Sequence, residues 1–185
     1  MGAAAEPRSA SAPPGVLALV TLLIVGFAVL PRVLKPRDEA LLGKPAPDFT
    51  LQLVANEAVL ATGKTTLTLS ELQGKPVILD FWATWCGPCQ AEAPIVNKVA
   101  QRYRDRGLVV VGVNTNDSPT RAHAWATSRG IGFPIVFDAG EATARAYGVD
   151  SLPTLVVVSR TGKILATRTG VTDDAELEAL VKQAL

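Results

Sequence analysis

Residues 80–89 of this chain read Asp-Phe-Trp-Ala-Thr-Trp-Cys-Gly-Pro-Cys and contain both of its cysteines. The apolar run Val77–Ala83 predicts a buried strand, and a helix is expected to begin at the cysteines. At the start of a helix, unpaired N–H groups and the positive end of the dipole stabilise a thiolate, which favours Cys86 as a nucleophile. Cys89 follows three residues later on the same helical face, close enough for a disulfide. The pattern predicts that Cys86 attacks a partner disulfide and that Cys89 resolves the adduct.

The small number of cysteines argues against a structural use of the pair. A secreted disulfide scaffold has more cysteines at wider spacing, and a structural zinc site needs about four ligands, which two cysteines and the distant His123 do not supply. Gln90 stands where covalent haem attachment requires a histidine. Soft thiolates can hold Cu(I), so a copper-binding module is a less favoured alternative, with no Met or His beside the pair. We expect neither a metal nor a cofactor.

The composition is that of a globular protein. Of the 185 residues, 48% are hydrophobic and 19% are charged, and the formal net charge is +1. Basic residues are scattered among acidic ones, and no Lys/Arg stripe with interleaved aromatic residues occurs. These features argue against disorder and against a nucleic-acid partner.

The amino-terminal part of the chain differs from the rest. No charged residue lies between Arg8 and Arg32, and residues 16–30 are almost entirely aliphatic. About 20 such residues span a bilayer core, so we expect a tail at 1–14 and a transmembrane anchor at 15–34. A cleaved signal peptide is the alternative, but the apolar run is not followed by the small residues of a cleavage site.

The charges beside the expected anchor bear on its orientation. Its amino-terminal flank carries Glu6 and Arg8, and its carboxyl-terminal flank carries Arg32, Lys35 and Arg37. The positive-inside rule, taken alone, would place the folded domain in the cytoplasm. This indication conflicts with the location implied by the family resemblance described below, and charge alone does not decide between the two.

Strand and helix signals alternate through the rest of the chain. After a tether at 35–47 we expect one folded domain at 48–185. Runs of β-forming residues predict strands at Phe49–Val54, Leu67–Leu69, Val77–Ala83, Leu108–Asn114, Pro134–Phe137, Thr154–Ser159 and Ile164–Thr169. Helical patterns and capping residues predict helices from the cysteines to Arg106, from Ser118, over about Glu141–Tyr147, and from Asp173 to the end. This order predicts an α/β sandwich with a mixed sheet.

Several segments resemble the thioredoxin superfamily and, within it, the membrane-anchored TlpA/ResA-like branch. Residues 85–89 are identical to the thioredoxin active-site sequence, and Pro94 matches the proline that kinks the active-site helix. Residues 152–154, Leu-Pro-Thr, resemble the cis-proline loop that faces the cysteines, and residues 43–49 resemble the leading segment of the branch. The resemblance covers roughly residues 41–185. It implies a thioredoxin-like three-layer sandwich with a mixed central sheet, preceded by an N-terminal transmembrane helix.

The resemblance also implies a function and a location. Members of this branch typically keep apocytochrome c cysteines, or other extracytoplasmic thiols, reduced, and they receive electrons from a membrane thiol carrier. We therefore expect a membrane-anchored reductase of protein disulfides whose domain lies on the extracytoplasmic (periplasmic) side. Gly87 and Pro88 between the cysteines, and Asp80 where many members have Asn, are more typical of thioredoxin. A general disulfide reductase or oxidant without a cytochrome role is therefore the alternative.

Two carboxylates are candidate catalytic residues by the same resemblance. Asp80 matches the buried acid of thioredoxin, which helps to move the proton of the second cysteine, and a carboxyl on a buried strand should have a raised pKa. Glu92 matches an acidic residue near the site in the TlpA/ResA branch. The alternatives are an Asp80 that is merely solvated at the strand end and an ordinary exposed Glu92 on the helix.

The residues around the cysteines are candidates for binding the partner. Trp82 should pack in the core beneath the active-site turn. An exposed apolar surface that fits extended thiol peptides is expected to be formed by Trp85, Gly87, Pro88, Leu152 and Pro153.

A thiol peroxidase is a further, less favoured alternative, because peroxiredoxins share the leading segment. Their catalytic pattern, placed on Cys86, requires a proline at position 79 and a threonine or serine at position 83. The chain has Leu79 and Ala83 instead, so the pattern is not met.

Overall fold

A computed structural model describes residues 15, 19, 22–25, 41–56 and 63–185. The chain divides into two compact units, Met1–Pro36 and Arg37–Leu185. The described residues of the first unit are helical. Among the positions that the structure describes, no helix combines the length and the apolar character needed to cross a membrane. The tail at 1–14 and most of the anchor expected at 15–34 lie outside the described residues.

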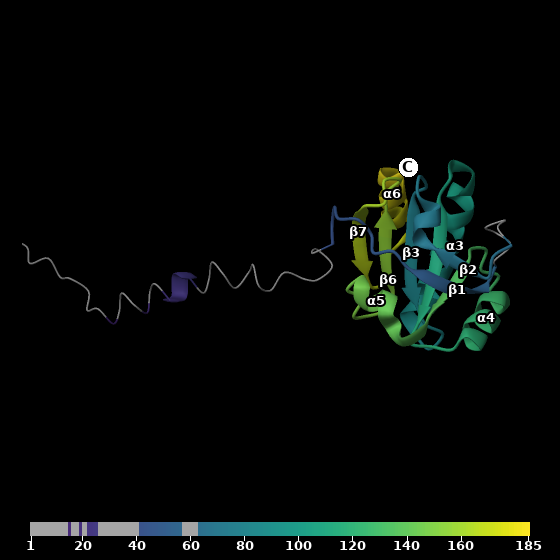
Figure 1. The fold of residues 1–185 in the computed structure, drawn as a ribbon, viewed down its shortest axis with the longest axis horizontal. Coiled ribbons are helices and arrows are strands. Elements are labelled where there is room, and N and C mark those ends of the chain that lie inside the picture. Colours follow the sequence, from purple (N-terminus) through teal and green to yellow (C-terminus); the bar gives the residue numbers. More distant parts are fainter. Residues whose placement is uncertain (1–14, 16–18, 20–21, 26–40, 57–62) are drawn as a thin grey trace, which may run out of the picture. The chain divides into compact units, whose positions relative to one another are not determined.

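Within its described residues, the second unit is built on one seven-stranded sheet (Figure 1). Its strands are β1 (Thr50–Ala55), β2 (Thr66–Thr68), β3 (Val77–Trp82), β4 (Val109–Thr115), β5 (Ile135–Asp138), β6 (Thr154–Val158) and β7 (Ile164–Thr169). Their order across the sheet is β2-β1-β5-β4-β3-β6-β7. Strand β4 pairs in parallel with β3 and β5, and the other neighbours are antiparallel. The sheet is therefore mixed, as the sequence predicts.

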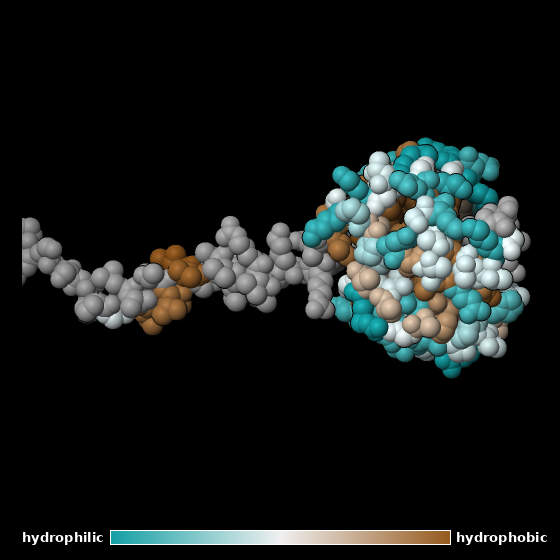
Figure 2. Space-filling view, in the orientation of Figure 1, coloured by the Kyte–Doolittle hydropathy of each residue, from teal (hydrophilic) through white to brown (hydrophobic). Residues whose placement is uncertain are grey.

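Helices cover both faces of this sheet. They are α3 (Gly87–Tyr103), α4 (Pro119–Ser128), α5 (Ala142–Ala146) and α6 (Asp174–Ala184), with 3₁₀ turns at Leu69–Leu72, Arg104–Arg106 and Ala139–Glu141. One core cluster joins the sheet to α3, α4 and α6, and a second joins the opposite face to α5 and to the chain before β3. The expected thioredoxin-like three-layer sandwich is thus confirmed. The face shown in Figure 2 is mainly hydrophilic over this unit, with small apolar areas between the polar side chains.

Strand β3 lies at the centre of the core, since all of its residues are buried. Alternate side chains of a strand point to opposite faces of the sheet. Ile78 and Trp82 enter the cluster under α3, while Leu79 and Phe81 enter the other cluster. Asp80 lies between Ile78 and Trp82 in the sequence and shares their face, so the strand directs one carboxyl toward the helix that carries the cysteines.

The helix after the cysteines ends earlier than the sequence predicts. Its α-helical geometry stops at Tyr103, and Arg104–Arg106 forms a 3₁₀ turn. Gly107 has a φ of 89°, and its N–H donates to the Arg104 carbonyl at 2.9 Å. This left-handed glycine closes the helix with a tighter turn than the helical pattern alone would give.

Residues 41–47, expected as the end of a tether, pack against the β6–β7 hairpin. The Gly43 N–H donates to the Ile164 carbonyl at 2.8 Å, and the Ile164 N–H donates to the Lys44 carbonyl at 3.0 Å. The folded domain therefore begins earlier than expected, because the edge of the hairpin offers backbone partners to the segment before β1. The remaining part of the tether, 35–40, lies outside the described residues.

Candidate active site

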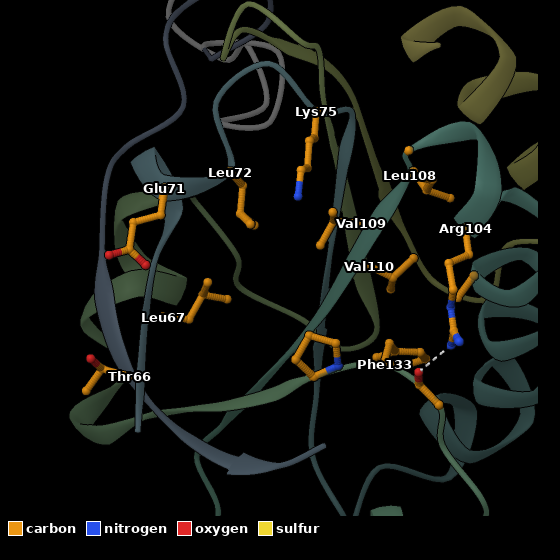
Figure 3. Close-up of a pocket in the computed structure, with 14 residues that line it drawn as sticks. Thr66, Leu67, Glu71, Leu72, Lys75, Arg104, Leu108, Val109, Val110 and Phe133 are labelled. Atoms are coloured by element: carbon orange, nitrogen blue, oxygen red, sulfur yellow. Dashed lines mark hydrogen bonds between the residues drawn. The ribbon is translucent and has the colours of Figure 1, made fainter. Parts of the chain in front are cut away.

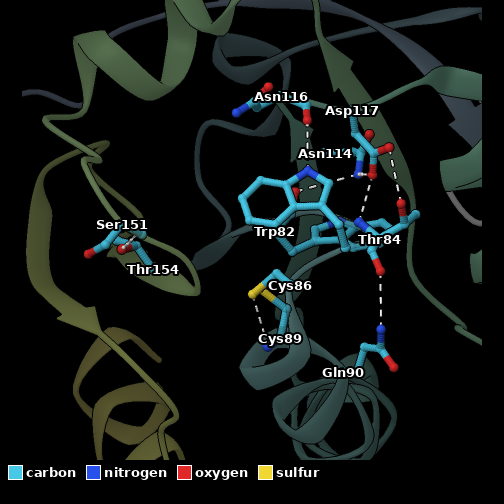
Figure 4. Close-up of a disulfide and its surroundings, with 11 residues drawn as sticks. Trp82, Thr84, Cys86, Cys89, Gln90, Asn114, Asn116, Asp117, Ser151 and Thr154 are labelled. Carbon is cyan, nitrogen blue, oxygen red and sulfur yellow. Dashed lines mark hydrogen bonds between the residues drawn. A yellow bond between two sulfur atoms is a disulfide. The ribbon is translucent and has the colours of Figure 1, made fainter.

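The two cysteines form a disulfide at the start of α3 (Figure 4). Their Cα atoms are 5.3 Å apart. Cys86 is the N-cap of α3, and its Sγ accepts a hydrogen bond from the Cys89 N–H at 3.2 Å. Pro88 lies in the first turn of the helix, where a missing N–H costs no helical hydrogen bond. The start of the helix therefore presents N–H groups and its positive end to the Cys86 sulfur, which stabilises a thiolate there.

Four of the five expected docking residues reach the surface. Trp85 is 59% exposed, although both cysteines are almost completely covered. Gly87 and Pro88 are exposed at the first turn of α3, and Leu152 is half-buried. An exposed apolar side chain therefore stands directly before Cys86.

The loop after β7 changes this surface in two ways. Pro153 follows a cis peptide bond and is buried rather than exposed as expected, because this loop lies against it: the Gly170 N–H donates to the Pro153 carbonyl at 2.9 Å. The next residue, Val171, is 51% exposed, and after it the Thr172 N–H donates to Glu92 at 2.8 Å. Val171 therefore adds an apolar side chain beside the site. The sequence around Val171 does not predict this position, because the loop reaches the site only through the antiparallel pairing of β6 with β7.

Asp80 is buried rather than solvated at the end of a strand. It is 5% exposed, and it lines a small cavity of about 10 Å³ together with Cys89 and Trp125. Its Oδ1 has no hydrogen-bond partner among the described residues. Burial raises the pKa of Asp80 well above its usual range, and the nearby carboxylate of Glu92 raises this pKa further. Asp80 and Cys89 thus line the same small cavity.

Glu92 is also buried, so the alternative of an ordinary exposed helical carboxylate is wrong. It is 1% exposed, and its Oε1 accepts the Thr172 N–H at 2.8 Å. Its Oε2 has no partner within the part of the chain that the structure describes. Burial raises the pKa of Glu92, and the hydrogen bond from Thr172 opposes this shift without cancelling it. Two carboxyl groups thus lie on the α3 side of the core, and each has an oxygen without a hydrogen-bond partner among the described residues.

Two tryptophans close the cavity beside Asp80. Trp82 is 3% exposed, as expected of a core residue, and its ring centroid lies 4.6 Å from that of Trp125 on α4. Both rings line the cavity, and neither indole N–H has a hydrogen-bond partner in the described residues. The Arg129 guanidinium lies 5.6 Å from the centroid of the Trp125 ring. The two indoles contribute to the burial of Asp80, and this burial is the main cause of its raised pKa.

The structure offers no set of metal ligands at the site. Over residues 41–56 and 63–185 and the few described positions before them, no three His, Cys, Asp or Glu side chains gather closely enough to hold a metal ion. His123 lies on the exposed side of α4, where its Nδ1 makes a hydrogen bond with the Val54 carbonyl at 2.7 Å. The redox group that the structure shows is the cysteine pair itself.

A separate hollow of about 260 Å³ opens between β2, β4 and the end of α3 (Figure 3). Its walls include Leu67, Leu72 and Phe133, with Lys75 and Arg104 among the lining residues. It contains none of the residues expected in the site.

Known proteins resemble this chain over most of its length. The family model described as Redoxin matches residues 41–182. The thiol–disulfide oxidoreductase ResA of Bacillus subtilis (strain 168) is 32% identical over 152 residues, which cover 82% of this chain and 80% of the relative.

Solved structures resemble the chain as well. A structure from Chlorobium tepidum, provisionally assigned as a thiol:disulfide interchange protein DsbE, has a TM-score of 0.68 and 33% identity, and the match covers 77% of this chain and 96% of that one. A structure from Bacteroides thetaiotaomicron, provisionally assigned as a protein disulfide isomerase, has a TM-score of 0.65 and 32% identity, with coverages of 77% and 86%.

Proposed function

This chain belongs to the Redoxin family and is a ResA-like thiol–disulfide oxidoreductase, and we propose that it reduces disulfides in extracytoplasmic proteins such as apocytochrome c. The observation that carries the proposal is the Cys86–Cys89 disulfide at the start of α3, beside a buried carboxyl group. The resemblance to the TlpA/ResA-like branch supports the direction of the reaction and the class of partner.

The proposed cycle starts from the dithiol form. The Cys86 thiolate attacks one sulfur of the partner disulfide, forms a mixed disulfide and displaces the other partner sulfur as a thiolate. Cys89 then loses its proton and attacks the Cys86 Sγ, which releases the second partner sulfur as a thiolate. The partner gains two electrons, and the chain is left with the Cys86–Cys89 disulfide seen here. A thiol donor must then return two electrons to the pair.

We assign the proton transfer in the second step to Asp80. Its unpaired Oδ1 and its place on the cavity wall beside Cys89 support this role. A carboxylate with a raised pKa is a stronger base than an exposed one, so it can accept the thiol proton near neutral pH. Glu92 supports the same role, since its negative charge raises the pKa of Asp80 further.

Partner binding is assigned to the apolar surface around the first turn of α3. Trp85, Gly87 and Pro88 are exposed there, and Leu152 and Val171 extend the surface on the side of the β6 and β7 loops. Apolar contacts without charged groups favour transient binding of extended peptides of many sequences, which suits an enzyme that must release each partner after one exchange.

We further propose that residues 15–34 anchor the protein in a membrane and that a membrane thiol carrier supplies its electrons on the extracytoplasmic side. The aliphatic stretch supports the anchor, and the branch resemblance supports the side. Protease added to intact cells stripped of their outer layers should digest the folded domain. Protection of the domain until the membrane is permeabilised would instead favour the cytoplasmic orientation indicated by the flanking charges.

A general disulfide reductase without a cytochrome role is the second candidate. The thioredoxin-type Gly87-Pro88 pair and the buried Asp80 favour it. It would use the same cycle with a wider range of partners, so the two candidates differ in the partners that are recovered from cells.

The test is to trap the partner on Cys86 with Cys89→Ser. This variant lacks the second thiol, so the mixed disulfide should persist and allow the partner to be identified by mass spectrometry after reduction. Cys86→Ser is the matched control and should trap nothing. Recovery of apocytochrome c supports the proposal, and recovery of many unrelated proteins favours the general reductase. Equal trapping by Cys86→Ser, or a potential near the oxidising end at about −120 mV, would contradict the reductase cycle.

A further inference from the structure

The loop between β4 and α4 holds the active-site turn through one carboxylate that the cycle above does not use. We propose that Asp117 is a positioning residue, which fixes the turn at residues 83–86 so that Trp85 stands in the orientation that protein partners require. The inference rests on the proposed docking role of Trp85. It does not require Asp117 to touch the reacting sulfur atoms.

Asp117 binds the active-site turn through Thr84. Its Oδ2 accepts the Thr84 N–H at 2.6 Å, and its Oδ1 accepts the Thr84 hydroxyl at 3.1 Å (Figure 4). The Thr84 carbonyl in turn accepts a hydrogen bond from the Gln90 side chain at 3.1 Å. Because Thr84 directly precedes Trp85, these bonds fix both the position and the orientation of the peptide that leads into the docking tryptophan.

The carboxylate is itself held from several sides. Asp117 accepts hydrogen bonds from the Asn114 side chain at 3.1 Å, from the Ser118 N–H at 2.8 Å and from the Arg121 Nε at 2.9 Å. Asn114 belongs to β4, so the carboxylate is tied to the central sheet. The Asp117 side chain is fully buried. Its hydrogen bonds therefore hold Thr84 in a fixed position relative to β4 and to the start of α4.

The charge of Asp117 is permanent at working pH. Burial alone would raise its pKa, but the hydrogen bonds from Thr84, Asn114 and Ser118 outweigh burial and lower the pKa to about 2. An ionised carboxylate makes shorter and stronger hydrogen bonds than a neutral acceptor. Its contacts to the Thr84 and Ser118 N–H groups are correspondingly short, at 2.6 and 2.8 Å.

Trp85 is held by the same loop at its outer end. Its indole N–H donates to the Asn116 carbonyl at 2.9 Å. Asn116 has a φ of 51° and directly precedes Asp117. The carbonyl that accepts the indole N–H therefore belongs to the residue next to the one that binds Thr84. With 59% of its surface exposed, Trp85 gains its orientation largely from these two points, the indole bond and the fixed Thr84 peptide.

This arrangement should matter more for proteins than for small disulfides. A protein partner must meet Trp85 and the Cys86 sulfur together, whereas a small disulfide needs the sulfur alone. A misplacement of about 1 Å in a positioning contact can cost up to about a hundredfold in rate. Loosening the turn is therefore expected to weaken reaction with a protein disulfide and to spare reaction with a small one.

Asp138 supplies a matched control. It is a buried aspartate at the end of β5, and its carboxylate accepts N–H groups from Thr143 at 3.0 Å and Ala144 at 2.8 Å, and the Thr115 hydroxyl at 3.4 Å. These donors belong to α5 and β4 rather than to the active-site turn. Its replacement removes a comparable set of hydrogen bonds without loosening Thr84.

The experiment compares Asp117→Ala with Asp138→Ala in the full chain. For each, KM and kcat are measured for reduction of insulin disulfides with a dithiol as reductant, and the reduced protein is also mixed with dithiobis(nitrobenzoate), a small aromatic disulfide. We expect Asp117→Ala to raise the insulin KM about tenfold, with kcat and the small-disulfide rate unchanged. In a Trp125→Phe background, which removes the other partly exposed indole, the acrylamide-quenchable tryptophan fluorescence reports Trp85, and its anisotropy should fall with Asp117→Ala. Asp138→Ala should change none of these.

Three results would overturn the proposal. They are an insulin KM that does not rise in a folded Asp117→Ala protein, an equal loss with the small disulfide, and an equal effect of Asp138→Ala. If Asp117→Ala does not fold, Thr84→Val takes its place, since it keeps the N–H bond and removes the hydroxyl bond. It should raise the insulin KM in the same direction, and an unchanged KM would overturn the proposal too. Failure of the unmodified protein to reduce any protein disulfide would refute the proposed function instead, and the Trp85 anisotropy would still test the role of Asp117.

Discussion

Asp80→Asn keeps the shape of the buried side chain and removes its ability to titrate. Burial raises the pKa of Asp80 above its unfolded value near 3.8, so between the two pKa values the folded protein binds more protons than the unfolded chain. In this range the free energy of unfolding of the unmodified protein falls as pH rises, by at most about 1.4 kcal/mol per pH unit. The variant lacks this decline. The difference in free energy of unfolding between the variant and the unmodified protein should therefore shift in favour of the variant as pH rises above 3.8, and should stop changing above the pKa of Asp80 in the folded protein.

The assay is urea unfolding at a series of pH values with the Cys86–Cys89 disulfide intact in both proteins. Asp117→Asn serves as a control of opposite sign. Because the pKa of Asp117 is lowered from 3.8 to about 2, its contribution to stability is present above 3.8 and is lost as pH falls toward 2. A stability difference between Asp80→Asn and the unmodified protein that does not change with pH would refute the reasoning, since Asp80 would then not titrate at a raised pKa.

The same substitution tests the proton transfer. If Asp80 accepts the Cys89 proton, Asp80→Asn should slow the attack of Cys89 on a preformed mixed disulfide by about 10²- to 10⁴-fold. The first attack, by Cys86, should keep its rate because the helix terminus stabilises that thiolate independently of Asp80. Stopped-flow measurement of the two steps separates them. An unchanged second step would show that another group takes the proton.

Three further predictions concern the packing, the second acid and the docking surface. A Cβ at Gly112 would lie 2.5 Å from the Ile135 Cδ1, so Gly112→Ala should lower the free energy of unfolding by about 1–3 kcal/mol, and adding Ile135→Val should restore part of it in urea unfolding. Glu92→Gln removes a charge that raises the pKa of Asp80, so the acidic limb of the pH profile for the second step should move to lower pH; a stationary limb would contradict the coupling. Val171→Asp should raise the KM for a protein disulfide without slowing a small one, and equal effects on both would remove Val171 from the docking surface.

The sequence predicted those parts of the site that depend on local chain geometry. The strand that ends at Trp82 and the helix that begins after Cys86 follow from one continuous stretch of apolar and capping residues. The burial of Glu92 did not follow, because the residue that covers and binds it, Thr172, lies 80 positions away. Asp117 was missed for the same reason: its role depends on the parallel pairing of β3 and β4, which brings the ends of both strands together.

The unpaired oxygens at this site are better explained by function than by stability. Asp80 occupies a position on β3 whose neighbours on the same face, Ile78 and Trp82, pack into the core, so an apolar residue of similar size would cost less to bury. An unsatisfied buried acceptor costs about 1–3 kcal/mol, and Asp80 and Glu92 each carry one when partners are sought among the described residues. Oxygens without a hydrogen-bond donor are the ones free to take a proton. Because Asp80 lies on the cavity wall beside Cys89, the stability lost there is consistent with the base that the proposed cycle requires when Cys89 attacks the mixed disulfide.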